Sequence, residues 1–484
     1  MTYIKQNNNQ YGAFGEQITA HKTPIVQIAN KYKIDPSELF EIEIFEATGG
    51  TADNNGNLFR CQSGTSVGGY GVIRSQETLN YRAGQGVECS ITSSFTTGIA
   101  NSLQFAGMFN LTETIAFGYD GANFSCLHSY GGVAELQVIE VTVTGAGTCT
   151  VTLDGDSVGI TVTNSDTSTN AREILNGLVA DSTINGKWRF DEIANKVYCI
   201  AKSVGDKTNT FSISGGVTAS ITEQTAGVAK TDNHTAQASW NITTTPFSGF
   251  DPTKLNLYKI KFGYLGIANI TFSIYDPTKG TFIDVHQIEW ANNYNVTHLG
   301  QPNLKAGWTS ASLGSSGTNL TVIGGSAAIF LEGDEVIKNN TFADENTVNS
   351  VATTLTNLIT IKNRVIYGDV YNLGKVFPVS VSIGNDHNKG AVIDIYRNAD
   401  VAGVPIFQFE SEFNSTVVAD KSGTTVTNGT LIKAFTVAAS SSIEIDLTPL
   451  KTELLAGDTF VVAARTLSGT STNMNVAITW KEEK

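Results

Sequence analysis

Charged residues are scarce in this sequence, and they form no basic run. Lys, Arg, Asp and Glu make up 16% of the 484 residues, and the formal net charge is −14. Proteins that bind nucleic acids or anionic membranes draw their affinity from clustered Lys and Arg. The composition therefore argues against a polyanion as partner, and we expect neither nucleic-acid nor membrane binding.

Cysteine motifs, long apolar runs and a leader-type N-terminus are also missing. The five Cys include no CxxC spacing and leave an odd residue over, which argues against a disulfide framework or a zinc site and predicts buried free thiols. No apolar run approaches the ~20 residues needed to cross a bilayer, and residues 1–10 are polar. We expect a chain that is made in a cytoplasm and is not anchored in lipid.

The residues that are abundant indicate an all-β protein. Gly occurs 47 times, and Asn, Thr and Ser fill the gaps between apolar residues. Turns need Gly and Asn while strands favour Thr, Val and Ile, so this mixture is typical of sandwiches and barrels. The length is enough for about three domains that each have a core.

Alternating apolar residues predict a sandwich that is split along the sequence. Strand patterns run through residues 57–136, where Asp120-Gly121 is typical of a hairpin turn. The same strand pattern resumes in residues 230–370, where the run from Tyr258 to Phe262 alternates apolar and polar side chains. We therefore predict that the two stretches form one domain in space.

The segment between these halves has a different pattern. Residues 137–229 contain strand-like stretches around one stretch of helical spacing, Ala171 to Val179, with Ser168, Thr169 and Asn170 as candidates for the helix N-cap. Surface loops accept insertions cheaply, because the closure cost grows only with the logarithm of loop length. We predict an inserted small β-sandwich-plus-helix domain.

The two ends of the chain are predicted to form separate parts. Residues 1–56 begin with a polar stretch, and Asp35-Pro36 indicates the start of a short helix; this is an arm or attachment segment or, alternatively, an edge strand and helix on the next domain. Residues 371–484 carry short strands at the spacing of a C-terminal β-sandwich. Residues 346–361 fit either a linking helix or a strand.

The split domain resembles concanavalin-like jelly rolls of the lectin and glucanase type. The resemblance rests on four stretches in order: Phe117-Gly-Tyr-Asp-Gly-Ala-Asn-Phe124, Tyr258-Lys-Ile-Lys-Phe262, Ile270-Thr-Phe-Ser-Ile274 and Phe282-Ile-Asp-Val-His286. The inserted segment, with its Gly205-Asp-Lys-Thr-Asn-Thr210 turn, resembles a small module of phage tail and fibre proteins. The resemblance implies an all-β, jelly-roll fold class.

Over nearly its full length the chain is similar to uncharacterised structural proteins of tailed phages and some large viruses. The features that match are Arg74 to Tyr81 before Gly84-Gln85-Gly86, the insertion, Ile395-Tyr-Arg-Asn398 and Gly457-Asp458. This similarity implies a head fibre, decoration or tail-associated protein on the virion surface, attached to other virion proteins through residues 1–56. Fibres and spikes are commonly symmetric homo-oligomers, and a trimer is our first expectation.

Glu41-Ile-Glu43-Ile-Phe-Glu46 resembles the catalytic strand of retaining β-glucanases, where Glu-x-Asp-x-x-Glu supplies nucleophile and acid/base. The resemblance implies Glu41 as nucleophile and Glu46 as acid/base, about 5 Å apart. Glu43 departs from the expected Asp, and in a regular strand Glu41 and Glu46 point to opposite faces. A strand with one charged face and no catalytic role has the same sequence pattern. We expect no enzyme, with a retaining glycan hydrolase as the alternative.

Exposed aromatics beside amides would give a lectin-like site, because sugar faces stack on Trp and Tyr while side-chain amides bind hydroxyls. Trp290, Asn292, Asn293 and Tyr294 form one such cluster, and Trp308 is a further candidate for contact with a host-surface glycan. The alternative for both Trp is core packing. The six His have no HxH or HExxH spacing, and no phosphate loop is present, so we expect no metal and no cofactor.

Overall fold

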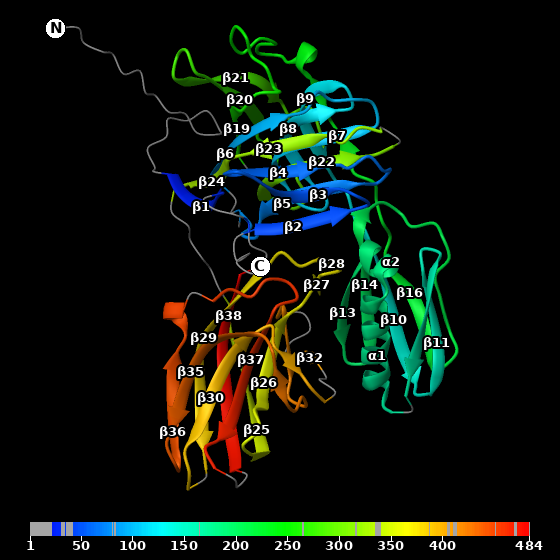
Figure 1. Ribbon diagram of the computed structural model, residues 1–484, viewed down its shortest axis with the longest axis vertical. Coiled ribbons are helices and arrows are strands. Elements are labelled where there is room, and N and C mark those ends of the chain that lie inside the picture. The colour runs from blue at the N-terminus through cyan, green and yellow to red at the C-terminus, as the bar shows by residue number, and fades with distance from the viewer. Residues whose placement is uncertain are drawn as a thin grey trace, which may run out of the picture. The chain divides into compact units, whose positions relative to one another are not determined.

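The computed structural model shows an almost entirely β protein made of two compact units. It describes residues 22–30, 34, 42–79, 81, 84–163, 165–263, 266–314, 317–333, 340–386, 388–403, 407–409, 414–450, 452–468 and 472–483. One unit comprises residues 1–132 and 229–336, and the other comprises residues 133–228 and 337–484. The strands and their labels are shown in Figure 1.

The first unit is built from two antiparallel sheets. Their strands are paired across segments far apart in the sequence. The nine-stranded sheet contains β21 (Thr281–Ile288), β20 (Ile270–Asp276), β19 (Asn256–Gly263), β6 (Gly86–Phe95), β23 (Thr321–Gly324), β4 (Leu58–Gln62) and β3 (Thr51–Asn55). Strand β24 (Ser326–Glu332) also pairs with β6, and β1 (Lys22–Ala29) pairs with β24. The eight-stranded sheet contains β17 (Thr231–Asp232), β18 (Thr235–Ala236), β9 (Asn123–Tyr130), β8 (Thr114–Asp120), β7 (Ser102–Phe109), β22 (Lys305–Ser312), β5 (Tyr70–Ser75) and β2 (Ile42–Ala47). A short 3-10 helix, η2 (Gln237–Ser239), follows β18.

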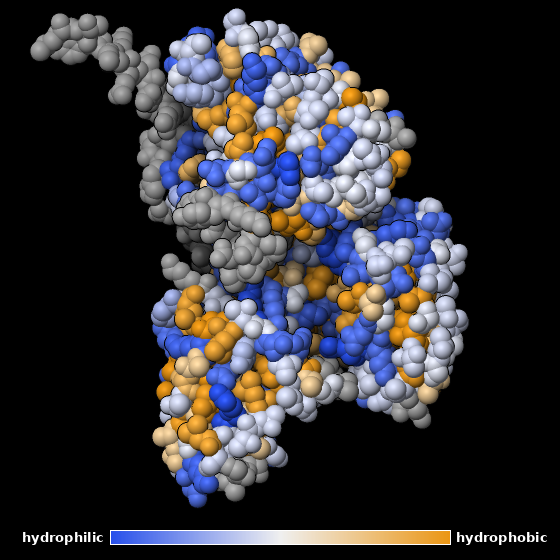
Figure 2. All heavy atoms as spheres, in the orientation of Figure 1, coloured by the Kyte–Doolittle hydropathy of each residue, from blue (hydrophilic) through white to orange (hydrophobic). Residues whose placement is uncertain are grey.

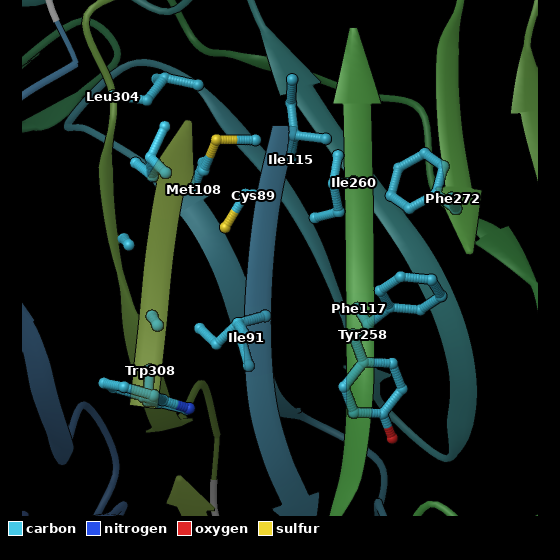
Figure 3. Close-up of a cluster of buried hydrophobic side chains, with 14 of the residues drawn as sticks. Cys89, Ile91, Met108, Ile115, Phe117, Tyr258, Ile260, Phe272, Leu304 and Trp308 are labelled. Carbon is cyan, nitrogen blue, oxygen red and sulfur yellow. The ribbon is translucent and has the colours of Figure 1, made fainter. Parts of the chain in front are cut away.

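The core of the first unit lies between these two sheets. β19 contributes Tyr258 and Ile260 and β8 contributes Ile115 and Phe117, and all four side chains are fully buried (Figure 3). The ring centroids of Phe117 and Tyr258 are 4.8 Å apart. The alternation predicted for residues 258–262 therefore marks the core face of β19, as a half-buried strand requires.

Trp308 in β22 occupies this core opposite Gly324. Its Nε1 donates a hydrogen bond to the carbonyl oxygen of Thr92 at 2.9 Å, and its ring lies 4.9 Å from that of Phe59. A Cβ at Gly324 would lie 2.1 Å from the indole, so glycine leaves the room that the ring occupies. Trp308 is thus a structural residue of the sandwich.

The inserted segment forms a small domain with its own core. It contains a four-stranded sheet, a three-stranded sheet and two helices: β13 (Trp188–Ile193), β14 (Lys196–Val204), β10 (Ala134–Val143), β16 (Thr218–Thr225); β12 (Asp156–Val162), β11 (Gly147–Leu153), β15 (Ser212–Ser214); α1 (Thr167–Ala180) and α2 (Ser182–Lys187). Val133 and Val228 exchange two backbone hydrogen bonds of 2.9 Å at its base. Helix α1 is capped by Asp166, whose side chain accepts from Thr169 N, so the cap precedes the predicted positions 168–170.

The C-terminal domain is a second sandwich of two antiparallel sheets. One contains β25 (Asn340–Val351), β38 (Thr472–Glu483), β29 (Lys375–Asn385) and β36 (Ser441–Asp446). The other contains β32 (Phe407–Phe409), β33 (Val417–Asp420), β26 (Thr356–Asn363), β37 (Thr459–Thr466), β30 (Ala391–Arg397) and β35 (Thr430–Val437). The hairpin of β27 (Ile366–Tyr367) and β28 (Val370–Tyr371), the two-stranded sheet of β31 (Asp400–Val401) and β34 (Val426–Thr427), and the 3-10 helix η3 (Thr448–Leu450) complete it.

The predicted fold class is confirmed: the protein is all-β, with a jelly-roll-type sandwich, an inserted small domain and a C-terminal sandwich. The limits of two segments differ from the prediction. Strands β1, β2 and β3 pair at the edges of the sheets of the first unit, so the described part of residues 1–56 forms edge strands, which was the alternative to an arm. Strands β25 and β26 pair with β38 and β37 of the C-terminal sandwich, although residues up to 370 were assigned to the split domain. The helix predicted at Asp35-Pro36 lies outside the described residues.

A buried ion pair joins the inserted domain to the C-terminal sandwich within the second unit. Asp191 of β13 is fully buried, and its carboxylate accepts from Lys362 Nζ at 2.5 Å and from Val365 N at 2.7 Å. Phe407 packs on Ile193 in a small apolar cluster. The two domains of this unit therefore share a packed, charged contact.

Candidate functional site

The segment that follows β21 is organised around the buried side chain of Trp290. Trp290 is fully buried, and its Nε1 donates a hydrogen bond to the carbonyl oxygen of Val296 at 2.6 Å. The rings of Tyr130 and His128 meet the indole edge to face, at centroid distances of 4.9 and 5.3 Å. Such edge-to-face contacts stabilise aromatic clusters beyond the area that they bury. The indole is therefore a fixed anchor for residues 291–297.

Tyr294 lies flat on this anchor and is exposed on its other side. The backbone N–H groups of Asn293 and Tyr294 donate to the carbonyl oxygen of Trp290 at 3.0 and 3.3 Å, and Asn292 adopts a left-handed φ of 66° in the turn. The Tyr294 ring stacks on the indole with a centroid distance of 4.0 Å and an interplanar angle of 19°. Tyr294 is 45% exposed, so the turn presents an aromatic ring in a fixed orientation.

Three side-chain amides lie next to Tyr294 in the sequence. Asn292, Asn293 and Asn295 are all exposed. Asn293 Nδ2 donates to the carbonyl oxygen of Glu289 at 3.1 Å, which orients that amide. An amide offers both a donor and an acceptor, and adjacent sugar hydroxyls need the same combination. The turn thus holds four of the five residues that the sequence predicts for a glycan site. Trp290 is buried, which corrects its prediction as a stacking ring, whereas Asn292, Asn293 and Tyr294 lie at the surface.

Titratable groups beneath the turn are buried and mostly neutral. The Nε2–H of His128 donates to the carbonyl oxygen of His298 at 2.8 Å, and burial lowers the pKa of each histidine to about 4. Glu113 accepts from Gly300 N at 2.9 Å, and burial raises its pKa to about 7. Neutral histidines avoid the cost of a buried charge. These groups fasten the end of the loop to the sandwich.

Trp308 is not part of this cluster, which corrects the prediction that its ring contacts a glycan. Its side chain is fully buried in the core between the two sheets (Figure 3). A ring without an exposed face has nothing to stack on a sugar. For Trp308 the alternative, core packing, is the observed state.

The acidic motif at the start of the chain is described only in part. Glu41 lies outside the described residues, as does the side chain of Glu43, whose backbone belongs to β2. Glu46 Oε1 accepts a hydrogen bond from Ala52 N at 2.6 Å, which ties β2 to β3. The described contact of Glu46 is therefore structural.

A Ser, His and Asp constellation occurs at the edge of the eight-stranded sheet, where no sequence motif predicted one. His234 Nδ1 lies 2.9 Å from Asp120 Oδ2, and its Nε2 lies 3.3 Å from Ser129 Oγ. A hydrolytic triad needs an accessible serine whose hydroxyl bonds to the histidine. Ser129 is 1% exposed and its hydroxyl donates to Asp232 at 2.6 Å. The group instead fastens β17 and β18 to β9. Asp232 and His234 lie 103 and 105 residues from Ser129 along the chain, so no local motif predicts the group.

The residues that the structure describes contain no group of three or more His, Cys, Asp or Glu side chains arranged to hold a metal ion. Within the same ranges no helix has the length and apolar character of a membrane span. All five Cys are free and buried, as predicted. On the face shown in Figure 2, hydrophobic side chains are interspersed with polar ones in both units.

Comparison with known proteins gives only distant similarities. No protein-family model and no curated protein matches the chain. Among solved structures, the chain is similar to arcelin-5, a lectin-like defence protein from Phaseolus vulgaris, with 8% identity and a TM-score of 0.23 over 62% of this chain and 96% of that one. The lectin UEA-II complexed with galactose gives 8% identity and a TM-score of 0.24 over 64% and 100%. The CBM22-1-CBM22-2 tandem domain from Paenibacillus barcinonensis Xyn10C gives 8% and 0.19 over 95% and 98%.

Proposed function

We propose that this protein is a carbohydrate-binding protein and that the turn at residues 289–298 binds the sugar. The observation that carries the proposal is the Tyr294 ring, which is held flat against the buried indole of Trp290 and exposed on its outer side. A ring fixed before binding loses little conformational entropy when a ligand stacks on it. The exposed amides of Asn292, Asn293 and Asn295 supply hydrogen bonds to hydroxyls.

The charge of the turn favours an uncharged sugar. No Lys or Arg occurs from residue 280 to residue 304, and Glu289 is the acidic residue next to Trp290. Sialylated, sulfated or uronic-acid glycans are anions and would need a cation for pairing. The proposed ligand is therefore a neutral glycan, bound by stacking and by neutral hydrogen bonds.

A glycan array followed by calorimetric titration tests this proposal on the full chain. Tyr294→Ala removes the platform and should weaken binding at least tenfold, whereas Tyr294→Phe keeps the ring and should stay within about threefold. Leu255→Ala removes another exposed apolar side chain of the first unit and is the matched control. Equal affinity of the wild-type chain and Tyr294→Ala would overturn the assignment of the site. Trp290→Ala is a poor probe, because it removes a buried side chain.

The proposal includes display on a virus particle and does not include catalysis. The similarity in sequence style to phage and large-virus structural proteins supports a virion component, attached to other virion proteins and arranged as a homo-oligomer, with the glycan on a host surface. Mass spectrometry of purified particles and location of the chain in a particle reconstruction test this part. A binding protein should release no sugar from a polysaccharide panel, and release that Glu46→Gln abolishes would contradict it.

A further inference from the structure

A hollow of about 410 Å³ lies on the outer face of the sheet that contains β25, β38, β29 and β36. Small-molecule sites occupy cavities of about 300 to 1,000 Å³, so the hollow has the size of a ligand site. Its lining is made of small and polar residues: Glu345, Asn346, Thr347, Ser382, Ile383, Gly384, Ser442, Asn475, Val476 and Ala477.

Strand register places the polar side chains in one row across the sheet. Thr347 faces Asn475, Asn475 faces Gly384, and Gly384 faces Ser442 on the three adjacent strand pairs. Alternate residues such as Val476 point inward and are buried in the core of the sandwich. The hollow is therefore a feature of the outer face, and a solid core supports its floor.

Gly384 keeps the floor of the hollow open. Its φ is outside the left-handed region, so the backbone there does not require glycine. A Cβ at this position would meet only the side chain of Asn475, at 3.6 Å, which is an ordinary van der Waals contact. A larger side chain can therefore be added without strain and would fill the hollow.

The amide of Asn475 is oriented to donate. Thr347 Oγ1 donates to Asn475 Oδ1 at 2.9 Å, which occupies the acceptor and directs the two Nδ2 hydrogens elsewhere. The neighbouring Asn346 has a different role, since its Nδ2 donates to the carbonyl oxygen of Leu358 at 2.6 Å. The exposed Glu345 carboxylate and the hydroxyls of Ser382 and Ser442 complete the set of hydrogen-bonding groups.

The chemistry of the lining selects the class of ligand. The described residues of the lining include no Lys or Arg to pair with an anion and no aromatic ring to receive an apolar molecule. A carboxylate accepts hydrogen bonds from hydroxyls, and an amide N–H donates to them. A second copy of this chain is disfavoured, because Glu345 and Glu444 would face like charges on a chain of net charge −14.

We propose that this hollow is a second saccharide-binding site, which holds a neutral mono- or disaccharide by hydrogen bonds to Asn475, Glu345 and the serine hydroxyls. The inference extends the proposed function to a second site in the other unit. A chain with two separate weak sites engages a repeated glycan with higher avidity than either site alone.

The test separates the two sites on the full chain. Ligand-observed saturation-transfer NMR is recorded with glucose, galactose, mannose, N-acetylglucosamine, lactose and cellobiose. In the Tyr294→Ala background, at least one sugar should still bind. Adding Gly384→Leu, which fills the hollow, or Asn475→Ala, which removes the donor, should weaken that binding at least tenfold. Asn473→Ala, an exposed asparagine two residues away on β38 and outside the lining, should leave it within twofold.

Three outcomes would overturn the inference. In the first, the wild-type chain binds sugar and Tyr294→Ala removes all of it, which leaves the turn as the binding site and the proposed function intact. In the second, the residual binding is unchanged by both Gly384→Leu and Asn475→Ala. In the third, the wild-type chain binds none of the sugars and shows no hit on the glycan array, which overturns the proposed function as well. If circular dichroism shows that Gly384→Leu is unfolded, Asn475→Ala decides.

Discussion

The ring of Tyr294 lies 4.0 Å from the indole of Trp290, and the two planes differ by 19°. The two residues differ in exposure: Trp290 is 0% exposed and Tyr294 is 45% exposed. The two rings therefore have different roles: the buried ring fixes the turn, and the exposed ring is available to a ligand. Removal of the buried ring should mainly affect stability, and removal of the exposed ring should mainly affect binding.

Removal of the buried ring should destabilise the first unit far more than removal of the exposed one. Trp290→Ala deletes a buried aromatic side chain and its hydrogen bond to Val296, and we expect a loss of about 3 to 5 kcal/mol in the free energy of unfolding. Tyr294→Ala should cost less than about 1 kcal/mol, because the side chain is half exposed. Urea unfolding followed by near-UV circular dichroism measures both. Similar losses in the free energy of unfolding for the two variants would contradict these different roles of the two rings.

The buried groups beneath the turn predict a pH dependence with two opposing parts. Burial lowers the pKa of His128 and His298 to about 4, below the unfolded value of about 6.5. Their contribution to the stability of the folded protein is therefore present above pH 6.5 and is lost as the pH falls toward 4. Burial raises the pKa of Glu113 to about 7, above its unfolded value near 4.5. Its contribution to the stability of the folded protein is therefore present below pH 4.5 and is lost as the pH rises through 7.

Glu113→Gln isolates the second part. From pH 7.5 to pH 5 the wild-type protein gains stability from protonation of Glu113 in the folded state, and the variant does not. We therefore expect the free energy of unfolding of Glu113→Gln to fall by about 2 kcal/mol relative to that of the wild-type protein between pH 7.5 and pH 5. Denaturant unfolding at the two pH values measures the difference. Parallel pH profiles would show that Glu113 titrates in the folded protein as it does in the unfolded chain.

Features that depend on neighbouring residues were predictable from the sequence. Asp120-Gly121 predicts a hairpin, and β8 and β9 meet there with Asp120 opposite Asn123 and Gly121 at a φ of 58°. The helical spacing from Ala171 to Val179 lies within α1. In both cases the signal and the structure lie within the same few residues, so tertiary contacts do not override it.

Features that depend on distant pairing were not predictable. Residues 346–361 fitted a helix or a strand, and pairing of β25 with β38 at the other end of the domain makes residues 340–351 a strand. Its inward positions include the polar residues Asp344 and Asn346, which break the apolar alternation between Phe342 and Val348. Trp290 and Trp308 were both candidates for exposed rings, yet both lie in the core of the first unit, where residues far from them in the sequence cover them. The residue that the turn exposes is Tyr294.

Gly324 should tolerate no side chain, because the indole of Trp308 occupies the space beside it. A Cβ at Gly324 would lie 2.1 Å from Trp308 Cε2, so Gly324→Ala forces the ring or the strand to move and should cost about 1 to 3 kcal/mol. At the adjacent Gly325 the nearest atom is Thr92 Oγ1 at 3.1 Å, and Gly325→Ala should cost less. Thermal unfolding of the two variants compares them directly. Equal shifts would show that the core makes room for the added carbon.

Lys362 neutralises a carboxylate that has no access to solvent, which predicts a large effect for a conservative change. Asp191 is 0% exposed, and its carboxylate lies 2.5 Å from Lys362 Nζ. Lys362→Met keeps the length of the side chain but leaves Asp191 buried without its cation, which should cost about 3 to 5 kcal/mol in the free energy of unfolding of the second unit. Lys196→Met is the matched control, since its 3.5 Å pair with Glu140 is exposed on both sides and should contribute less than about 1 kcal/mol. Urea unfolding separates the two cases. A loss of less than 1 kcal/mol for Lys362→Met would show that the fold of the second unit does not depend on this ion pair.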